Sequence, residues 1–134
     1  MSKIIRIICA IILFFHGLIH LMGTTVYMKL GSLDGFPYKT SILNGRMDLG
    51  ESGIYIFGVL WALAAIGFVV TAVGLFNQSK WNQSLLIGVS IFSLVLTGLD
   101  WEIASTGFIV NVAILAIVWI VSSQKSQRKL NLSA

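Results

Sequence analysis

Charged residues are scarce in this sequence. Asp, Glu, Lys and Arg make up 10% of the 134 residues, whereas 57% are hydrophobic and the mean hydropathy is +0.92. A soluble domain usually carries about 25% charged residues. So few charges could not cover a surface that faces water, but such a surface suits lipid. The composition therefore excludes an ordinary soluble domain and predicts a single membrane domain over residues 1–134.

Cysteine and proline are also nearly absent, with one residue of each. Cys9 lies within the first apolar run, so an intramolecular disulfide is impossible and a packing role is favoured. Pro37 lies in a polar stretch of roughly 30 residues that also contains Asn44-Gly45. Loops of this length tend to be functional or to contain short elements of their own.

Four apolar segments approach the roughly 20 residues that an α-helix needs to cross about 30 Å of hydrocarbon. We expect spans at residues 4–22, 54–76, 84–101 and 103–121, with a loop over residues 23–53. The first span has the basic start of a signal peptide, but no A-x-A-like cleavage site follows it, so we interpret it as retained. The predicted fold class is all-α, an antiparallel bundle of four transmembrane helices.

The placement of charge predicts the orientation. An even number of spans puts both termini on one side, and that side carries six basic residues and no acid: Lys3, Arg6, Lys80, Lys125, Arg128 and Lys129. The other side carries three basic residues and all five acids: Lys29, Lys39, Arg46, Asp34, Asp48, Glu51, Asp100 and Glu102. The positive-inside rule therefore predicts a multi-pass protein of the cytoplasmic membrane with cytoplasmic termini. Because the basic residues flank spans, nucleic-acid binding is excluded.

The second span has two local signals. Gly58, Ala62, Ala65, Val69 and Ala72 are spaced by 4, 3, 4 and 3 residues, which predicts a small-residue seam where another helix packs closely.

Before that span, Asp48-Leu-Gly-Glu51 has the spacing of a capping box. It predicts a helix with Asp48 as its N-cap and Glu51 at the third helical position.

Two histidines lie in the last turns of the first apolar segment. His16 and His20 are four residues apart, so on a helix they share a face and lie about 6 Å apart along the axis. Ionisable groups inside a span are costly and usually face a bundle interior or a water-filled cavity. This pair is therefore the main candidate for a functional site.

The predicted topology brings further polar side chains to the same outer half of the bundle. Glu51 lies at the outer start of the second helix, Asp100 and Glu102 lie at the outer end of the third, and Asn111 is expected about one turn inside the fourth. These four residues are the candidate partners of the histidines in a ligand-binding site.

The third segment has its own polar stripe. Ser90, Ser93, Thr97 and Asp100 are spaced by 3, 4 and 3 residues, so they share one helical face. We expect that face to contact other helices and not lipid.

Three kinds of chemistry remain open for the histidine pair. With a carboxylate it could bind zinc or another transition metal, although Gly17 stands where an H-E-x-x-H motif has its catalytic Glu. It could instead relay protons or hold the polar head of a quinone or lipid. Alternatively, each histidine hydrogen-bonds a neighbouring helix and fixes the packing. The residues single out no catalytic group, no metal ligand set and no cofactor.

Three short motifs resemble DoxX-like proteins, a broad group of small bacterial four-helix membrane proteins. His16–Gly23 is similar to the first helix of that group, and Leu60–Ala65 is similar to its second span. Trp101, Gly107 and Asn111 resemble its signature at the turn into the last helix. Where the group has Asp two residues after that Trp, this chain has Ile103. The resemblance implies four membrane helices and, as for some DoxX-like proteins, an association with quinone-coupled redox complexes.

Our leading functional hypothesis is a binding or redox-accessory membrane subunit. In it, His16 and His20 hold a lipophilic ligand, a quinone or a lipid, near the outer leaflet. One alternative is a small transporter or export subunit that acts as an oligomer, with Ser93, Thr97 and Asp100 lining a path. Another is a metal-dependent membrane enzyme. The expected partners are the lipid bilayer and either further copies of the chain or a membrane complex.

Overall fold

The computed structural model describes residues 3–133, and the side chains of residues 3–123. It contains α1 (Lys3–Tyr27), β1 (Ser41–Ile42), β2 (Met47–Asp48), α2 (Gly50–Phe76), α3 (Asn82–Leu99) and α4 (Trp101–Ser133). All four helices are long and apolar enough to cross a membrane, α4 over Trp101–Ser123. The predicted all-α fold with four helices of spanning length is confirmed. Lys125, Arg128 and Lys129 of the expected basic flank lie outside the residues whose side chains are described.

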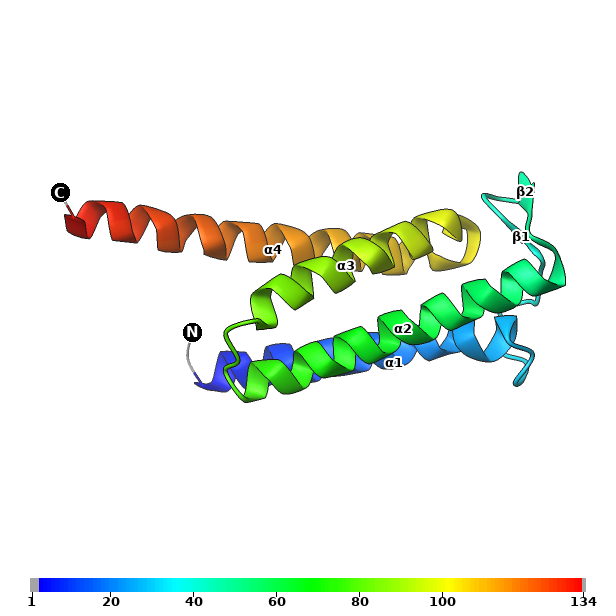
Figure 1. Ribbon diagram of the computed structural model, residues 1–134, viewed down its shortest axis with the longest axis horizontal. Coiled ribbons are helices and arrows are strands. Elements are labelled where there is room, and N and C mark those ends of the chain that lie inside the picture. Colours follow the sequence, from blue (N-terminus) through cyan, green and yellow to red (C-terminus); the bar gives the residue numbers. More distant parts are fainter. Residues whose placement is uncertain (1–2, 134) are drawn as a thin grey trace.

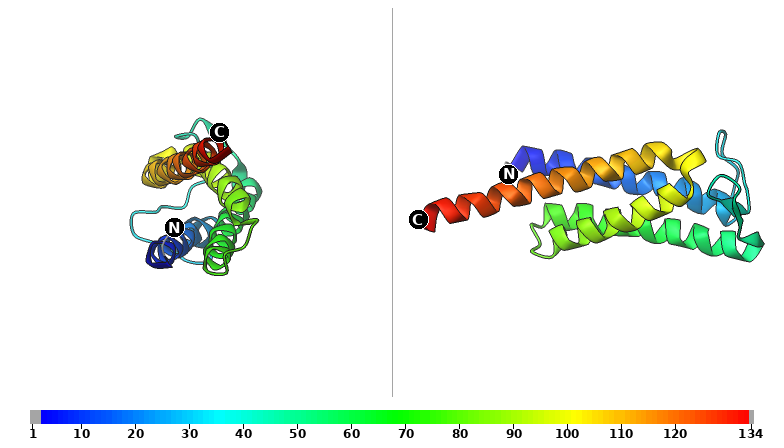
Figure 2. Two further views of the ribbon diagram at one scale, coloured as in Figure 1. Left: turned by 90° about the vertical axis from the view of Figure 1, so that its left-hand side faces the viewer. Right: turned by 90° about the horizontal axis from the view of Figure 1, so that it is seen from above.

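The helices form two antiparallel hairpins, α1 with α2 and α3 with α4 (Figure 1). The start of α1 and the end of α4 lie at one end of the bundle, and the short β1–β2 hairpin lies at the other. Seen from the end, the helices follow one another around an open arc (Figure 2). The packed neighbours are α1 with α2, α2 with α3, and α3 with α4. Side chains alone therefore connect α1 to α3 and α4 across the open side.

Two helices are longer than their expected spans at the end that carries the β-hairpin. α1 continues through Tyr27, because Val26 and Tyr27 are buried in its last turn and Thr25 Oγ1 donates to the carbonyl of Leu21 at 2.8 Å. α2 begins at Gly50, before the expected residue 54. The connection between the two helices is therefore shorter than the expected loop of residues 23–53.

The capping box predicted for α2 is wrong. The residue before the helix is Leu49, which makes no side-chain cap. Asp48 belongs to β2, where its carboxylate accepts a hydrogen bond from the backbone N–H of Gly50 at 3.0 Å. This bond holds the pKa of Asp48 below its usual value. Glu51 does not reach back to the cap; it pairs with Lys29 at 2.8 Å.

The connection between α1 and α2 folds back over the end of the bundle. Phe36 and Ile42 from this segment are 7% and 4% exposed and join the apolar cluster around Trp61. The backbone N–H of Leu43 donates to the carbonyl of Leu99, the last residue of α3, at 2.7 Å. The segment is therefore docked onto the corner between α3 and α4.

A second apolar cluster fills the opposite half of the bundle. Its buried members are Leu13, Phe68 and Ala72. Half-buried side chains from α2, α3 and α4 pack against it, namely Leu75, Leu86, Val89 and Ile114. The core of this half is thus mainly apolar, although Thr71 and Asn82 are buried there and Thr71 Oγ1 donates to the carbonyl of Gly67 on its own helix at 2.8 Å.

Helices α1 and α2 approach closely at glycines. The expected seam on α2 is confirmed in part, since Gly58, Ala65 and Ala72 are buried whereas Ala62 and Val69 are half-buried. α1 contributes glycines of its own: a Cβ on Gly17 would lie 2.9 Å from the Cβ of Phe68 and 3.0 Å from the carbonyl oxygen of Ala65. Side chains cannot fit at such distances without separating the helices.

We therefore expect Gly17→Leu to lower the free energy of unfolding by about 1–3 kcal/mol, the usual effect of overpacking a close contact. The measurement is denaturant titration of the purified protein in detergent micelles. Gly88→Leu is the control, because a Cβ on Gly88 meets nothing within 4 Å. Equal losses in both variants would contradict the close α1–α2 contact.

Candidate functional site

Both histidines lie inside the bundle. His16 is 7% exposed and His20 is 2% exposed, and their ring centroids are 4.9 Å apart. Helix α2 covers them with aromatic rings: Phe68 lies 4.7 Å from His16 and 5.3 Å from His20, and Trp61 lies 5.4 Å from His20. The pair is therefore enclosed on the α2 side, and its polar atoms meet α3 and α4.

The hydrogen bonds of His20 define its tautomer. Nδ1 lies 2.9 Å from the carbonyl oxygen of His16. A carbonyl can only accept, so Nδ1 carries a proton. With no anionic partner, a buried imidazole is stable in its neutral form, which leaves Nε2 as an acceptor. The Ser93 hydroxyl, 2.5 Å away, therefore donates to Nε2.

The orientation of Asn111 follows from the same argument. Its Nδ2 lies 3.0 Å from the carbonyl oxygen of Gly107 and 2.7 Å from Ser93 Oγ. Because the Gly107 carbonyl can only accept, the amide nitrogen must face it. The amide oxygen then faces His16 Nε2 at 3.2 Å and accepts its proton.

The four side chains of His16, Asn111, Ser93 and His20 thus form a closed circuit, which we call the histidine network. His16 donates to Asn111, Asn111 to Ser93, Ser93 to His20, and His20 to the backbone carbonyl of His16. All four bonds run in one direction around the circuit. The network ties α1 to α3 and α4 across the open side of the arc.

The network lies deeper than expected. Asn111 follows the first residue of α4 by ten positions, which places it about 15 Å along the helix at 1.5 Å per residue. The sequence analysis expected it about one turn from the helix end. Asn111 already follows the expected start at residue 103 by eight positions, about 12 Å, so the expected depth was too small, and the start of α4 at Trp101 adds about 3 Å.

The carboxylates expected beside the histidines lie elsewhere. In the part of the chain whose side chains are described, no carboxylate hydrogen-bonds or pairs with either imidazole. Of the candidate partners Asn111, Asp100, Glu102 and Glu51, the structure brings only Asn111 to the histidines.

Asp100 is the centre of a second polar group, the outer ion cluster of Tyr27, Lys39, Asp100 and Glu102. Asp100 is 1% exposed. The Tyr27 hydroxyl donates to its Oδ2 at 2.5 Å, and Lys39 Nζ lies 2.9 Å from its Oδ1. Lys39 also lies 3.3 Å from the exposed carboxylate of Glu102. Sequence reasoning missed Tyr27 and Lys39, because neither stands in a local pattern that points to Asp100.

The polar stripe on α3 faces the bundle interior, as expected. Ser90, Ser93 and Thr97 are 0%, 0% and 1% exposed. Thr97 Oγ1 donates back to the carbonyl of Ser93 at 2.8 Å. Ser90 Oγ is buried and has no hydrogen-bond partner among the described residues.

The donor set that a metal would need is not assembled among the described residues. No group of three His, Cys, Asp or Glu side chains there is close enough to hold a metal ion. The two imidazoles are engaged with Asn111 and Ser93. The hypothesis of a metal-dependent enzyme therefore has no ligand set in this part of the chain.

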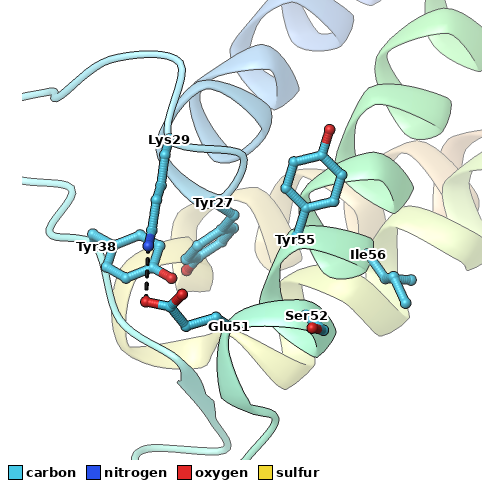
Figure 3. A pocket seen from close by; sticks show the side chains of 7 residues that line it. All are labelled: Tyr27, Lys29, Tyr38, Glu51, Ser52, Tyr55 and Ile56. Carbon is cyan, nitrogen blue, oxygen red and sulfur yellow. Dashed lines mark hydrogen bonds and ion pairs between the residues drawn. The ribbon is translucent and has the colours of Figure 1, made fainter.

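Neither of the two recesses described here, both on the surface of residues 3–123, is lined by a histidine. The outer recess, of about 460 Å³, lies between the end of α1, the following segment and the start of α2; it is lined by Tyr27, Lys29, Tyr38, Glu51, Ser52, Tyr55 and Ile56 (Figure 3). The inner groove, of about 390 Å³, lies between α1 and α2 near the chain ends; it is lined by Ala10, Ile11, Phe14, Phe15, Ala72, Val73 and Phe76.

The outer recess combines aromatic and charged groups. The Lys29 ammonium lies 4.9 Å from the centroid of the Tyr38 ring and 2.8 Å from the Glu51 carboxylate. The hydrogen bond to Glu51 raises the pKa of Lys29 above its usual value. Figure 3 shows Lys29 reaching across the recess to Glu51, while Tyr55 points outward from α2.

No family model, curated protein or solved structure matches this chain. The resemblance to DoxX-like proteins therefore stays a prediction. The structure does give two of its motif residues a physical connection, since Asn111 donates to the carbonyl of Gly107 one turn earlier on α4.

We expect Asn111→Ala to lower the free energy of unfolding by about 1–3 kcal/mol, because it leaves the buried His16 donor without a partner. The measurement is denaturant titration in micelles. Ser123→Ala on the same helix is the control, since its hydroxyl is exposed and bonds only to its own helix. Combining Asn111→Ala with Ser93→Ala should give less than the sum of the two losses; simple additivity would contradict a closed network.

We expect Asp100→Asn to lower the free energy of unfolding by about 3 kcal/mol, because Lys39 then loses its buried counter-charge. The control is Glu51→Gln, which breaks the exposed pair with Lys29 and should cost less than about 1 kcal/mol. Similar losses from the two variants in the same titration would show that the buried Asp100–Lys39 pair contributes no more to stability than the exposed Glu51–Lys29 pair.

Proposed function

We propose that this protein is a small multi-pass membrane subunit that binds an amphipathic ligand, a quinone or a lipid, at the outer leaflet. Four helices of spanning length support the membrane location. The excess of basic residues at the end of the bundle that carries the termini supports cytoplasmic termini. The outer recess then opens at the level of the outer leaflet.

The geometry of the outer recess is the observation that carries the proposal. Its volume of about 460 Å³ lies within the range of small-molecule sites, about 300–1,000 Å³. Three tyrosines line it, of which Tyr38 and Tyr55 are 39% and 49% exposed. Aromatic side chains with a polar tip suit the boundary between hydrocarbon and water. An amphipathic ligand would place its apolar part on these rings and its polar atoms on Lys29 or Glu51.

In this proposal the histidine network supports the site and does not contact the ligand. Both imidazoles are buried and all their protons are used within the network. Neither neutral imidazole has a proton left to donate to a ligand. The network instead positions α1, whose last residue, Tyr27, both lines the outer recess and bonds to Asp100.

The course of the polar stripe on α3 gives the transporter hypothesis less support than the outer recess gives the binding hypothesis. From Asp100 the stripe runs inward along α3 to Ser90. Beyond that point the interior holds the apolar cluster of Leu13, Phe68 and Ala72, and the buried Thr71 hydroxyl donates to its own helix at Gly67. A polar path through one copy would end there. The stripe also faces inward, so it is not available to line a path between copies.

We expect a saturable rise in the melting temperature of the purified protein with a short-chain ubiquinone or with a short-chain phosphatidylcholine. When the free ligand concentration is a hundred times Kd, binding adds about 2.7 kcal/mol to the free energy of unfolding. Tyr55→Ala should remove most of the rise. Ile66→Ala is the control, because Ile66 is an exposed apolar residue on α2 outside the recess.

Two further outcomes decide between the sites. A double variant with His16→Ala and His20→Ala should keep the ligand-dependent rise on a lower baseline. If that variant loses the rise while Tyr55→Ala keeps it, the histidines hold the ligand and the outer recess does not. If neither probe stabilises the unmodified protein, the binding function itself is wrong.

A further inference from the structure

The inner groove lies at the opposite end of the bundle from the outer recess. Its lining is entirely apolar and comes from the first half of α1 and the last turns of α2. Its lining includes Phe14, Phe15 and Phe76, which are 40%, 59% and 47% exposed. A groove of about 390 Å³ with this lining suits a hydrocarbon chain.

The charges near this groove are all positive. Lys3 and Arg6 lie on the first turns of α1, and Lys80 lies in the turn after α2. Arg6 is one helical turn from Ala10, which lines the groove, so the two residues share a face of α1. All five acidic residues of the chain lie toward the other end of the bundle. These cations therefore have no acidic side chain beside them within the described residues.

Among these three cations, Arg6 is the one with a buried nitrogen that lacks a hydrogen-bond partner among the described residues. The Arg6 side chain is half-buried, and this nitrogen is its Nε. A guanidinium can bind two oxygens of a phosphate at once, through a pair of charge-assisted hydrogen bonds. Lys3 and Lys80 are exposed and add positive charge around it.

We propose that the inner groove and Arg6 together bind an anionic glycerophospholipid. One acyl chain lies in the groove along Phe14 and Val73, and the phosphate is held by Arg6. Basic sites between helices at the cytoplasmic surface bind anionic lipid headgroups in this way. The positive charge that no acid offsets favours a net anionic lipid over a zwitterionic one, although both contain a phosphate. This site is independent of the outer recess and of the function proposed for it.

The test is native mass spectrometry of the detergent-solubilised protein, titrated with phosphatidylglycerol and with phosphatidylcholine of the same chain length. We expect the protein to retain phosphatidylglycerol about tenfold more tightly. Arg6→Gln should reduce this preference to near unity, since one charge-assisted contact accounts for about a tenfold change. Arg46→Gln is the matched control, because Arg46 is an exposed arginine at the other end of the bundle.

A second variant tests the groove without changing charge. Val73 lines the groove and is 52% exposed, so Val73→Trp should fill the groove while the helix still faces lipid. We expect it to weaken retention of both lipids. Equal retention of the two lipids by the unmodified protein would overturn the proposal. So would an unchanged preference in Arg6→Gln, or undiminished retention of both lipids in Val73→Trp.

Discussion

A polar group enclosed between apolar helices must find its hydrogen-bond partner within the protein, because no water is present to replace it. The histidine network meets this requirement at the centre of the bundle. The carbonyls of His16 and Gly107 can only accept, and from these two atoms the tautomer of His20 and the orientation of Asn111 follow. The two helical hairpins pack against each other through α2 and α3, and these bonds add a connection from α1 to α3 and α4.

The two halves of the bundle are built by different means. Toward the β1–β2 hairpin, Lys39 neutralises the buried carboxylate of Asp100 and Tyr27 donates a hydrogen bond to it. The segment before α2 closes over the aromatic cluster around Trp61. Toward the chain ends, glycine contacts and the apolar cluster around Phe68 supply most of the packing between helices. Both surface recesses follow from this division: the outer recess has charged and aromatic walls, and the inner groove has apolar ones.

Helical periodicity and span length were enough to predict four long helices and the inward polar stripe on α3, and they gave Asn111 as one of four candidate partners of the histidines. They could not predict the partners of the carboxylates. Lys39 reaches Asp100 only because the segment between α1 and α2 folds back over the bundle, and no local pattern encodes that path. The prediction of a capping box was wrong for a related reason. Asp48 pairs with Ser41 in the β-hairpin, so Leu49, and not Asp48, is the residue before α2.

The one-way direction of the histidine network bears on proton movement. A chain of hydrogen bonds conducts protons repeatedly only if every link can reverse after a proton has passed. Here the His20 Nδ1 proton is directed at one backbone carbonyl and the Asn111 amide at another, and neither oxygen can become a donor. Reversing the circuit would leave both carbonyls facing acceptors. The network therefore connects the helices and does not conduct protons, even though it contains two imidazoles within a helix long and apolar enough to cross a membrane.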